Sequence, residues 1–193
     1  MVETLEQWDI DLFFAINSRH NPFFDQVFYF ISHGLSWIPV YMLLFYFLAK
    51  FYGIKIALVQ VLLAGAMVGL ADVTSVYLFK NTVCRYRPCH NEAFRNFVHI
   101  VNDHRGGIFG FVSSHAVNFM TWTIVVFWFL KQQVKSNWLW LMFLIPLVVG
   151  YSRVYLGVHY PGDVAGGFLL GTVFGLAGIL IWKRVINKRI KSR

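Results

Sequence analysis

Long apolar runs constrain this sequence more than any other feature. Residues 54–79 form the clearest run, whose 26 residues extend roughly 39 Å as a helix, more than the hydrocarbon core of a bilayer. A chain inside lipid has to satisfy its backbone hydrogen bonds internally, so such runs form helices. Apolar residues make up 58% of the chain and charged residues 13%, about half the charged share of soluble domains. The sequence therefore predicts an all-α, polytopic membrane protein with a single domain.

The apolar runs predict a transmembrane helix bundle of five spans. The stretch at 23–51 is interrupted around Ser32-His33-Gly34, so it is either one long tilted span or a short lead-in before a span from about Leu35. The other four spans are predicted at 54–79, 115–130, 138–151 and 161–182. A sixth span follows if the N-terminal stretch also crosses the membrane.

Residues 3–18 place apolar side chains at helical spacing against an acidic face. This stretch is too short to cross a bilayer, so we expect a helix that lies in the membrane interface. Its acidic character also argues against a cleavable signal peptide, which needs a basic start. The chain is thus divided into an interfacial region and lead-in at 1–34, spans and loops at 35–182, and a basic tail at 183–193.

Positive charge decides the predicted orientation. The formal charge is +8, but basic residues gather on the cytoplasmic side of membrane proteins without any partner, so nucleic acid is not an expected partner. The tail is placed in the cytoplasm, and alternation puts the turns at 50–55 and 131–135 on the same side. These segments hold ten of the seventeen Lys and Arg residues, and the other seven lie on the opposite face, at Arg19, Lys80, Arg85, Arg87, Arg95, Arg105 and Arg153. An anionic substrate on that face explains their position.

Lys80, Arg85 and Arg87 form the first of three polar junctions on this face. Lys80 and Arg87 are seven residues apart, so they share one side of a helix that continues to this point. Pro88 disfavours helical geometry in the residue before it and predicts that the helix ends there. The alternative is that these side chains reach for lipid headgroups, although three basic residues within eight favour a binding site.

Ser113, Ser114 and His115 form the second junction, directly before an apolar run. Serine is a preferred N-cap, and the free amides of a first helical turn bind anions. Capping alone accounts for Ser113, but it gives no reason for His115.

Ser152, Arg153, His159 and Asp163 form the third junction, between the last two apolar runs. Charges at the edge of a membrane span need partners or a function. The Arg153 guanidinium suits a phosphate or carboxylate, and Asp163 can hold one nitrogen of the His159 ring so that the other acts as a base or nucleophile. Pro161 fits the first position of the last helix, which puts Asp163 in its first turn. The alternative is that Asp163 only compensates the helix dipole.

Together the junctions contain Lys-x6-Arg-Pro, Ser-x-His and Ser-Arg-x5-His-x3-Asp. This order resembles the motifs of the type 2 phosphatidic-acid phosphatase family, the membrane relatives of the vanadium haloperoxidases. The first and third motifs match at every defining position. The second departs from the family's usual Pro-Ser-Gly-His, because this chain has Val112 and Ser114 at the first and third positions. A serine keeps the backbone amide but adds a side chain, so the loop has to avoid a glycine-only conformation.

The resemblance implies a single membrane-embedded phosphatase domain, residues 1–193, that needs no metal or other cofactor. His159, oriented by Asp163, attacks phosphorus and forms a phosphohistidine, while His115 protonates the departing oxygen and then activates water. The phosphoryl oxygens are held by Lys80, Arg87, Ser113, Ser114 and Arg153. The loop histidines lack a tight metal-ligand spacing and are interpreted as polar loop residues: His90, His99 and His104.

The position of the junctions, at the ends of spans where headgroups lie, predicts a lipid phosphate or diphosphate as substrate. The expected location is a bacterial inner membrane, with the site facing the periplasm or the cell exterior and no obligate protein partner. Undecaprenyl diphosphate is the first candidate, and phosphatidylglycerophosphate, phosphatidic acid and lipid A phosphates are alternatives. A transporter or flippase for anionic lipids would use the same cations but would not need His159, Asp163 and His115. A structural subunit would leave the outward basic residues unexplained.

Three features outside the motifs also lead to expectations. Asp72 lies mid-span, roughly 12 Å from Lys80 along a helix, and is expected to form a structural bond inside the bundle. Cys84 and Cys89 are expected to be free thiols, with a disulfide in an oxidising compartment as the alternative. Close helix packing is predicted at glycines that repeat every four residues, Gly167, Gly171 and Gly175.

Overall fold

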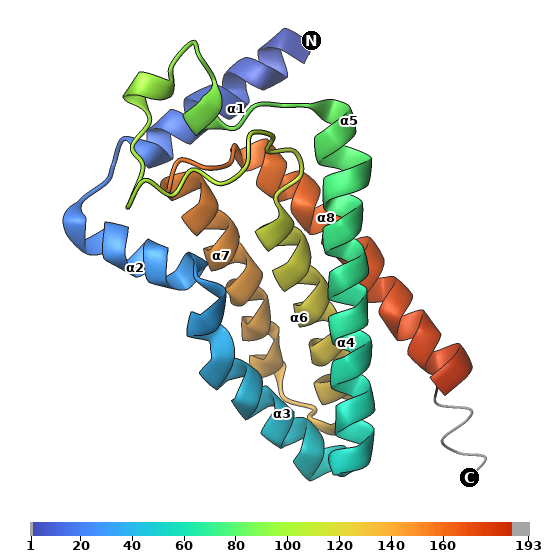
Figure 1. The fold of residues 1–193 in the computed structure, drawn as a ribbon. Coiled ribbons are helices and arrows are strands. Elements are labelled where there is room, and N and C mark those ends of the chain that lie inside the picture. Colours follow the sequence, from blue (N-terminus) through green and yellow to red (C-terminus); the bar gives the residue numbers. More distant parts are fainter. Residues whose placement is uncertain (1, 187–193) are drawn as a thin grey trace.

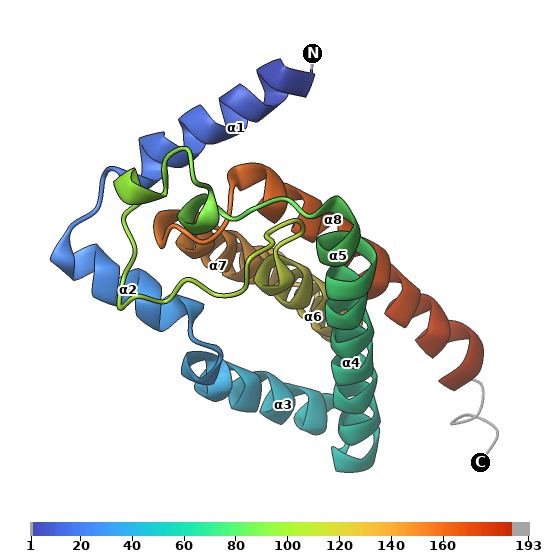
Figure 2. The same ribbon diagram turned by 45° about the horizontal axis from the view of Figure 1, so that its top comes forward.

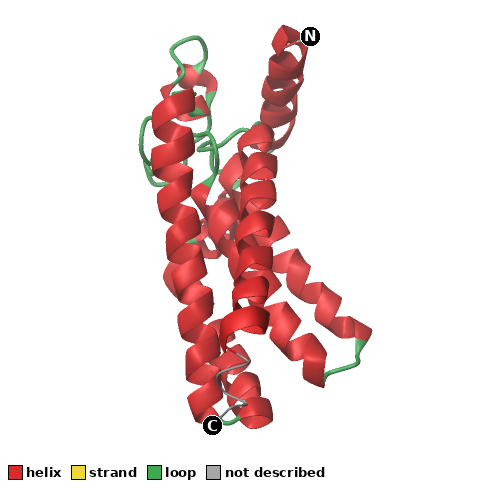
Figure 3. Cartoon of the chain, turned by 90° about the vertical axis from the view of Figure 1, so that its right-hand side faces the viewer, coloured by secondary structure: helices red, strands yellow, loops and turns green. Residues whose placement is uncertain are grey.

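The computed structural model describes residues 2–186, and in this part of the chain the regular elements are helices (Figures 1 and 3). An isolated antiparallel bridge joins Tyr86 to Phe109 within the long loop that precedes α6. The prediction of an all-α protein is therefore confirmed.

The N-terminal region forms two helices, α1 (Val2–Asn17) and α2 (Pro22–Ser32). Asn21 starts α2, because its side-chain oxygen accepts a hydrogen bond from the Phe24 amide at 2.9 Å. After α2 the backbone of His33 is extended, and the 3₁₀ segment η1 (Gly34–Trp37) leads into α3 (Ile38–Tyr52), which runs in a different direction from α2 (Figure 1). Of the two alternatives for 23–51, the short lead-in before a separate span is the one that forms. The interfacial position of α1 stays a prediction.

The rest of the bundle begins at Gly53, whose φ of 80° lies in the left-handed region that favours glycine. Helix α4 (Ile54–Thr74) continues through the π-helical turn η2 (Ser75–Lys80) into the short helix α5 (Asn81–Val83). A loop at 84–113 contains the 3₁₀ turns η3 (Pro88–His90) and η4 (Arg95–Phe97). The remaining elements are α6 (Ser114–Gln133), η5 (Asn137–Phe143), α7 (Leu144–Tyr155), α8 (Pro161–Ile181) and the π turn η6 (Trp182–Ile186).

Four helical segments of the described chain are long and apolar enough to cross a membrane: Gly34–Tyr52, Ile54–Val83, Asn137–Tyr155 and Pro161–Val185. Helix α6, which the sequence predicts as a further span, is not among them. It packs against α3, α4, α7 and α8, so its surface faces protein more than lipid and tolerates buried polar residues such as Thr121 and Thr123. The count of five spans stays a prediction.

The glycines of α8 let this helix pack directly on α6. A Cβ added at Gly171 would lie 2.5 Å from the carbonyl oxygen of Val117, and one added at Gly167 would lie 2.8 Å from the carbonyl oxygen of Ser113. Gly175 faces Ile124 at a similar distance. Any side chain at these positions would push the helices apart, so the predicted role of the glycines in close packing is confirmed.

The two ends of the bundle differ in their connections. Loop 84–113 lies over one end, where α6 and α8 begin and α7 ends (Figures 1 and 2). The turn between α3 and α4, the turn between α6 and α7, and the end of α8 lie at the other end (Figure 1). This other end carries the lysines of the turns at 50–55 and 131–135. The predicted tail at 183–193 falls mostly outside the described residues.

Asp72 accepts a hydrogen bond from Asn118 Nδ2 at 2.9 Å, which joins α4 to α6 inside the bundle. The Asp72→Asn variant is therefore expected to keep most of the phosphatase activity that the motif resemblance implies, because an amide oxygen can accept the same bond. Phosphate release by the purified variant, compared with wild type, checks this. A near-total loss would assign Asp72 to the chemistry instead.

Candidate active site

The first motif is split between a helix and an extended segment. The helix ends at Val83, because Cys84 adopts the left-handed conformation with φ 52°. Residues 85–87 then run beside 108–110, with the Arg87 amide donating to the Ile108 carbonyl at 3.0 Å and the Gly110 amide to the Arg85 carbonyl at 2.8 Å. The expectation that a continuing helix carries Lys80 and Arg87 to Pro88 is therefore wrong.

His159 is the buried centre of the third motif, with 1% of its surface exposed. Its Nδ1 lies 3.4 Å from Asp163 Oδ2, and its Nε2 lies 3.1 Å from an Arg87 guanidinium nitrogen. Asp163 is in the first turn of α8, as predicted, and its Oδ2 also accepts the Tyr160 amide at 3.0 Å in a capping box. A neutral ring with its proton on Nδ1 fits these partners and leaves the Nε2 lone pair toward Arg87.

Two buried polar groups without a hydrogen-bond partner lie at the start of α6 and the end of α7. Ser113 occupies the N-cap position of α6, but its hydroxyl makes no capping bond. Ser113 Oγ and Arg153 Nε are both buried and have no hydrogen-bond partner among the described residues. Another nitrogen of Arg153 donates to the Ser32 hydroxyl, which fixes the guanidinium. Buried groups of this kind are normally paired, so they suit a bound anion.

Ser114, where the family usually has glycine, contacts the lysine of the first motif. Its hydroxyl accepts a hydrogen bond from Lys80 Nζ at 2.6 Å and lies 2.8 Å from the Ser75 hydroxyl. The added side chain thus holds Lys80 at the start of α6. Contact of the Ser114 amide with phosphate stays a prediction.

Positive charge converges on the His159 ring. Burial lowers the pKa of His159 well below its ordinary value, and the charges of Arg87, Arg153 and Lys80 lower it further. His115, in the first turn of α6, lies within electrostatic range of the same cations and of His159. The structure therefore brings together residues from all three motifs.

The lowered pKa of His159 leads to an expected pH profile. In the role that the motif resemblance implies, the ring has to be neutral, and a lower pKa keeps it neutral as the pH falls below about 6.5, the ordinary value for histidine. We expect the acid limb of kcat/KM that follows His159 to lie below that pH. The measurement is kcat/KM against pH with p-nitrophenyl phosphate, whose leaving group needs no proton. An acid limb at or above pH 6.5 in the wild-type protein would contradict this.

The model of the PAP2 superfamily matches residues 57–187, which contain all three motifs. The chain belongs to the PAP2 superfamily. It is accordingly a phosphatase of this superfamily, which confirms the family resemblance and the enzyme class inferred from the motifs.

Known members of the superfamily match this PAP2 protein over most of its length. A lipid A 4'-phosphatase of Bacteroides thetaiotaomicron is 33% identical over 184 residues, covering 94% of this chain and 79% of the relative. An undecaprenyl-diphosphatase of Sulfolobus acidocaldarius is 28% identical over 189 residues, covering 96% and 84%. The crystal structure of a PAP2-type phosphatidylglycerolphosphate phosphatase from Bacillus subtilis shares the fold, with a TM-score of 0.70, 22% identity, and coverage of 94% and 88%.

Asp9 and Gly110 were not predicted to take part in this PAP2 site, and Arg85 was counted in the first junction without a role of its own. Arg85 forms an ion pair with Asp163, and Asp9 of α1 forms another with Arg85. Gly110 leaves room for both neighbours of His159, since a Cβ there would lie 2.8 Å from Asp163 Oδ2 and 3.2 Å from Arg87 Cγ. One feature of the sequence could have indicated that Arg85 takes part. Residues two apart on an extended segment share a face, so Arg85 would lie on the same side as Arg87.

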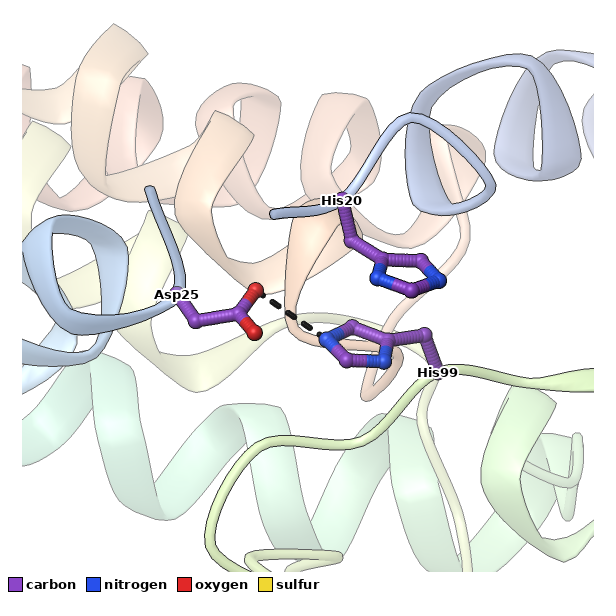
Figure 4. A group of neighbouring side chains, drawn as sticks. All are labelled: His20, Asp25 and His99. Carbon is purple, nitrogen blue, oxygen red and sulfur yellow. Dashed lines mark hydrogen bonds and ion pairs between the residues drawn. The ribbon is translucent and has the colours of Figure 1, made fainter. Parts of the chain in front are cut away.

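His20, Asp25 and His99 form a separate group of side chains whose ligand atoms lie within 4.8 Å of one another (Figure 4). The two imidazoles stack with centroids 3.6 Å apart and an interplanar angle of 4°. The in-plane lone pairs of the two rings therefore lie in two parallel planes, whereas the lone pairs of metal ligands converge on one point. Asp25 Oδ1 already accepts bonds from His99 Nε2 at 3.0 Å and from the Tyr155 hydroxyl at 2.9 Å. We interpret the group as a polar contact that ties the loop to α2.

The two cysteines have separate surroundings. Cys84 is exposed at the end of α5, and Cys89 is buried with its sulfur 3.4 Å from the Arg105 carbonyl oxygen. Both are free thiols in the structure.

Proposed function

We propose that this PAP2 phosphatase removes a phosphate from a membrane lipid through a covalent intermediate on His159. The observation that carries the proposal is the fixed, buried imidazole between Asp163 and Arg87, with one nitrogen held and the other directed to a cation. A transporter would need cations to bind a lipid phosphate, but it would not need a histidine held in this manner.

The proposed reaction has two displacements at phosphorus. The Nε2 lone pair of His159 forms an N–P bond while the bond from phosphorus to the lipid oxygen breaks, and His115 gives its proton to that oxygen. His115 then takes a proton from water, whose oxygen attacks phosphorus and breaks the N–P bond. Charge on the phosphoryl oxygens is stabilised by Lys80, Arg87 and Arg153, with Ser113 and Ser114 as further donors. Nδ1 keeps its proton toward Asp163 throughout.

An open cavity of about 770 Å³ beside the motifs supports a lipid as substrate. Its walls are mainly apolar and come from α1 and the start of α8, with Leu5, Trp8 and Ala165 among them, and Arg85 is part of its lining. An acyl or isoprenoid chain fits such walls. The site is proposed to open to the extracytoplasmic side of a bacterial inner membrane, in line with the basic turns at the opposite end of the bundle.

Lipid A carrying a 4'-phosphate is our first candidate substrate, because the relative that acts on it is 33% identical over nearly the whole chain. Undecaprenyl diphosphate was the first candidate from the sequence alone and now takes second place. It is supported by a relative that is 28% identical over a similar length. Phosphatidylglycerophosphate and phosphatidic acid complete the set to be compared.

The test is phosphate release from these four lipids by the purified full-length protein in detergent. Wild type, His159→Ala and His20→Ala are compared, the last as a matched control because His20 is exposed and outside the motifs. We expect release by wild type and by the control but not by His159→Ala, and the lipid with the highest kcat/KM identifies the substrate. Equal release by wild type and His159→Ala would refute the mechanism. Binding without release of phosphate from any of the lipids would favour the transporter.

A further inference from the structure

We propose that helix α1 positions the nucleophile through Asp9 and Arg85, which together hold the carboxylate of Asp163 toward His159. This inference rests on the proposed function of His159. It makes Arg85 and Asp9 positioning residues, since neither contacts the His159 ring itself.

Arg85 is held from three sides. One guanidinium nitrogen donates to Asp163 Oδ1 at 3.0 Å, and another lies 2.8 Å from Asp9 Oδ2. The guanidinium carbon also lies 4.1 Å from the centre of the Tyr160 ring, within cation–π range. A planar guanidinium with both of its terminal nitrogens engaged has little freedom to rotate.

Asp163 depends on Arg85 for the direction of its carboxylate. The side chain is fully buried, and its Oδ2 is shared by the Tyr160 amide at 3.0 Å and His159 Nδ1 at 3.4 Å. The bond to His159 is thus the longest of the contacts made by this carboxylate. Arg85 is the partner of the other oxygen, Oδ1, and it places a positive charge beside a buried negative one. Without it the carboxylate loses its counter-ion and can turn away from the ring.

Asp9 connects this arrangement to α1. Its Oδ1 accepts the Gly162 amide at 2.7 Å, in the first turn of α8, while its Oδ2 faces Arg85. The approach is so close that a Cβ at Gly162 would lie 2.7 Å from Asp9 Oδ2. Helix α1 is therefore attached both to the helix that carries Asp163 and to the arginine that orients it.

The same face of α1 that carries Asp9 also presents apolar side chains. Leu5, Trp8 and Leu12 are more than half exposed, at 58%, 65% and 51%, and they line the open cavity together with Asp9 and Arg85. Contact of a lipid with this surface and the geometry of the proposed nucleophile are therefore linked through one aspartate and one arginine.

The test compares Arg85→Gln, Arg85→Lys, Asp9→Asn and the double variant of Arg85→Gln with Asp9→Asn, in the full-length protein with p-nitrophenyl phosphate. Misplacement of a reacting group by about 1 Å costs about 100-fold, so we expect Arg85→Gln to lower kcat by about 10- to 100-fold with little change in KM. Arg85→Lys should recover part of this loss. Asp9→Asn should lower kcat about 3- to 10-fold, and the double variant should be no slower than Arg85→Gln alone, because coupled positions are not additive.

Two matched controls separate positioning from general damage. Asp11→Asn changes an exposed aspartate of the same helix that is bonded to Gln7, and Arg105→Gln breaks an exposed ion pair with Asp103. Both should retain wild-type kcat. A purely structural role would lower the melting temperature of the Arg85 and Asp9 variants without lowering kcat per folded molecule.

Three outcomes would overturn the inference. An unchanged kcat in Arg85→Gln and Asp9→Asn, while His159→Ala is inactive, would refute it alone and leave the proposed function intact. A rise in KM without a fall in kcat would make Arg85 a substrate ligand instead. Activity of His159→Ala equal to wild type would refute the proposed function and this inference together.

Discussion

Replacement of His159 by alanine is expected to abolish turnover, with a loss of kcat of about 10⁵- to 10⁶-fold, the scale on which removal of a nucleophile acts. The ring is buried between Asp163 and Arg87, and the variant leaves a cavity lined by both charges with no atom that can attack phosphorus. Phosphate release gives the rate, and transfer of labelled phosphate to the protein shows the intermediate. The label should be stable to base and labile to acid in wild type, and absent from His159→Ala.

His20→Ala is the control for this loss, since it removes a histidine that is exposed and lies in the connection between α1 and α2. It should keep both the rate and the label. Labelling of His159→Ala at the wild-type level would move the nucleophile to another residue, and His115 would be the first to examine.

The His115→Asn variant is expected to lose activity in proportion to how poor the leaving group is. General acid catalysis contributes about 10²- to 10⁴-fold, so hydrolysis of a phosphate on a sugar hydroxyl, as in lipid A, should fall by that factor. With p-nitrophenyl phosphate the departing oxygen needs no proton, and the loss of the phosphorylation rate should stay within about tenfold. With a lipid diphosphate the leaving group is the lipid monophosphate, which is a better leaving group than an alkoxide, so the loss should lie between the two.

The measurement is the rate of phosphohistidine formation in a single turnover, for wild type and His115→Asn with each substrate. The series tests the role of the residue, because each substrate has to show the dependence on an acid that its leaving group requires. Equal losses with all leaving groups would contradict the role as acid and indicate that His115 binds the phosphoryl group instead.

The third motif was predictable from sequence because its parts are close along the chain. Pro161 at a helix start places Asp163 in the first turn, four residues after His159, and this local geometry needs no knowledge of the tertiary structure. The glycine spacing of the last span likewise predicted close helix packing, and the structure shows that the partner is α6. Both inferences depend on helical periodicity, which apolar runs make easy to recognise.

The first motif shows where such reasoning stops. A spacing of seven fits one helix face, but the left-handed Cys84 ends the helix four residues before Pro88, and the motif then pairs with residues 108–110. No spacing rule connects Arg85 to Asp9, which is 76 positions away in the chain, or to Asp163. Similarly, α6 is less apolar than the other long helices because its neighbours, rather than lipid, surround it. These features depend on contacts between distant segments.

The glycines of α8 that pack on α6 also set the separation between the two helices at whose N-terminal ends the candidate histidines lie. His115 is in the first turn of α6 and His159 lies two residues before α8, so the separation between the axes of these helices determines the distance from the proposed acid to the proposed nucleophile. Gly171 lies a little more than two helical turns beyond Asp163, yet a larger residue there would act as a wedge against Val117. Variation at this position would therefore alter the distance between the proposed proton donor and the proposed attacking atom without a change in either residue.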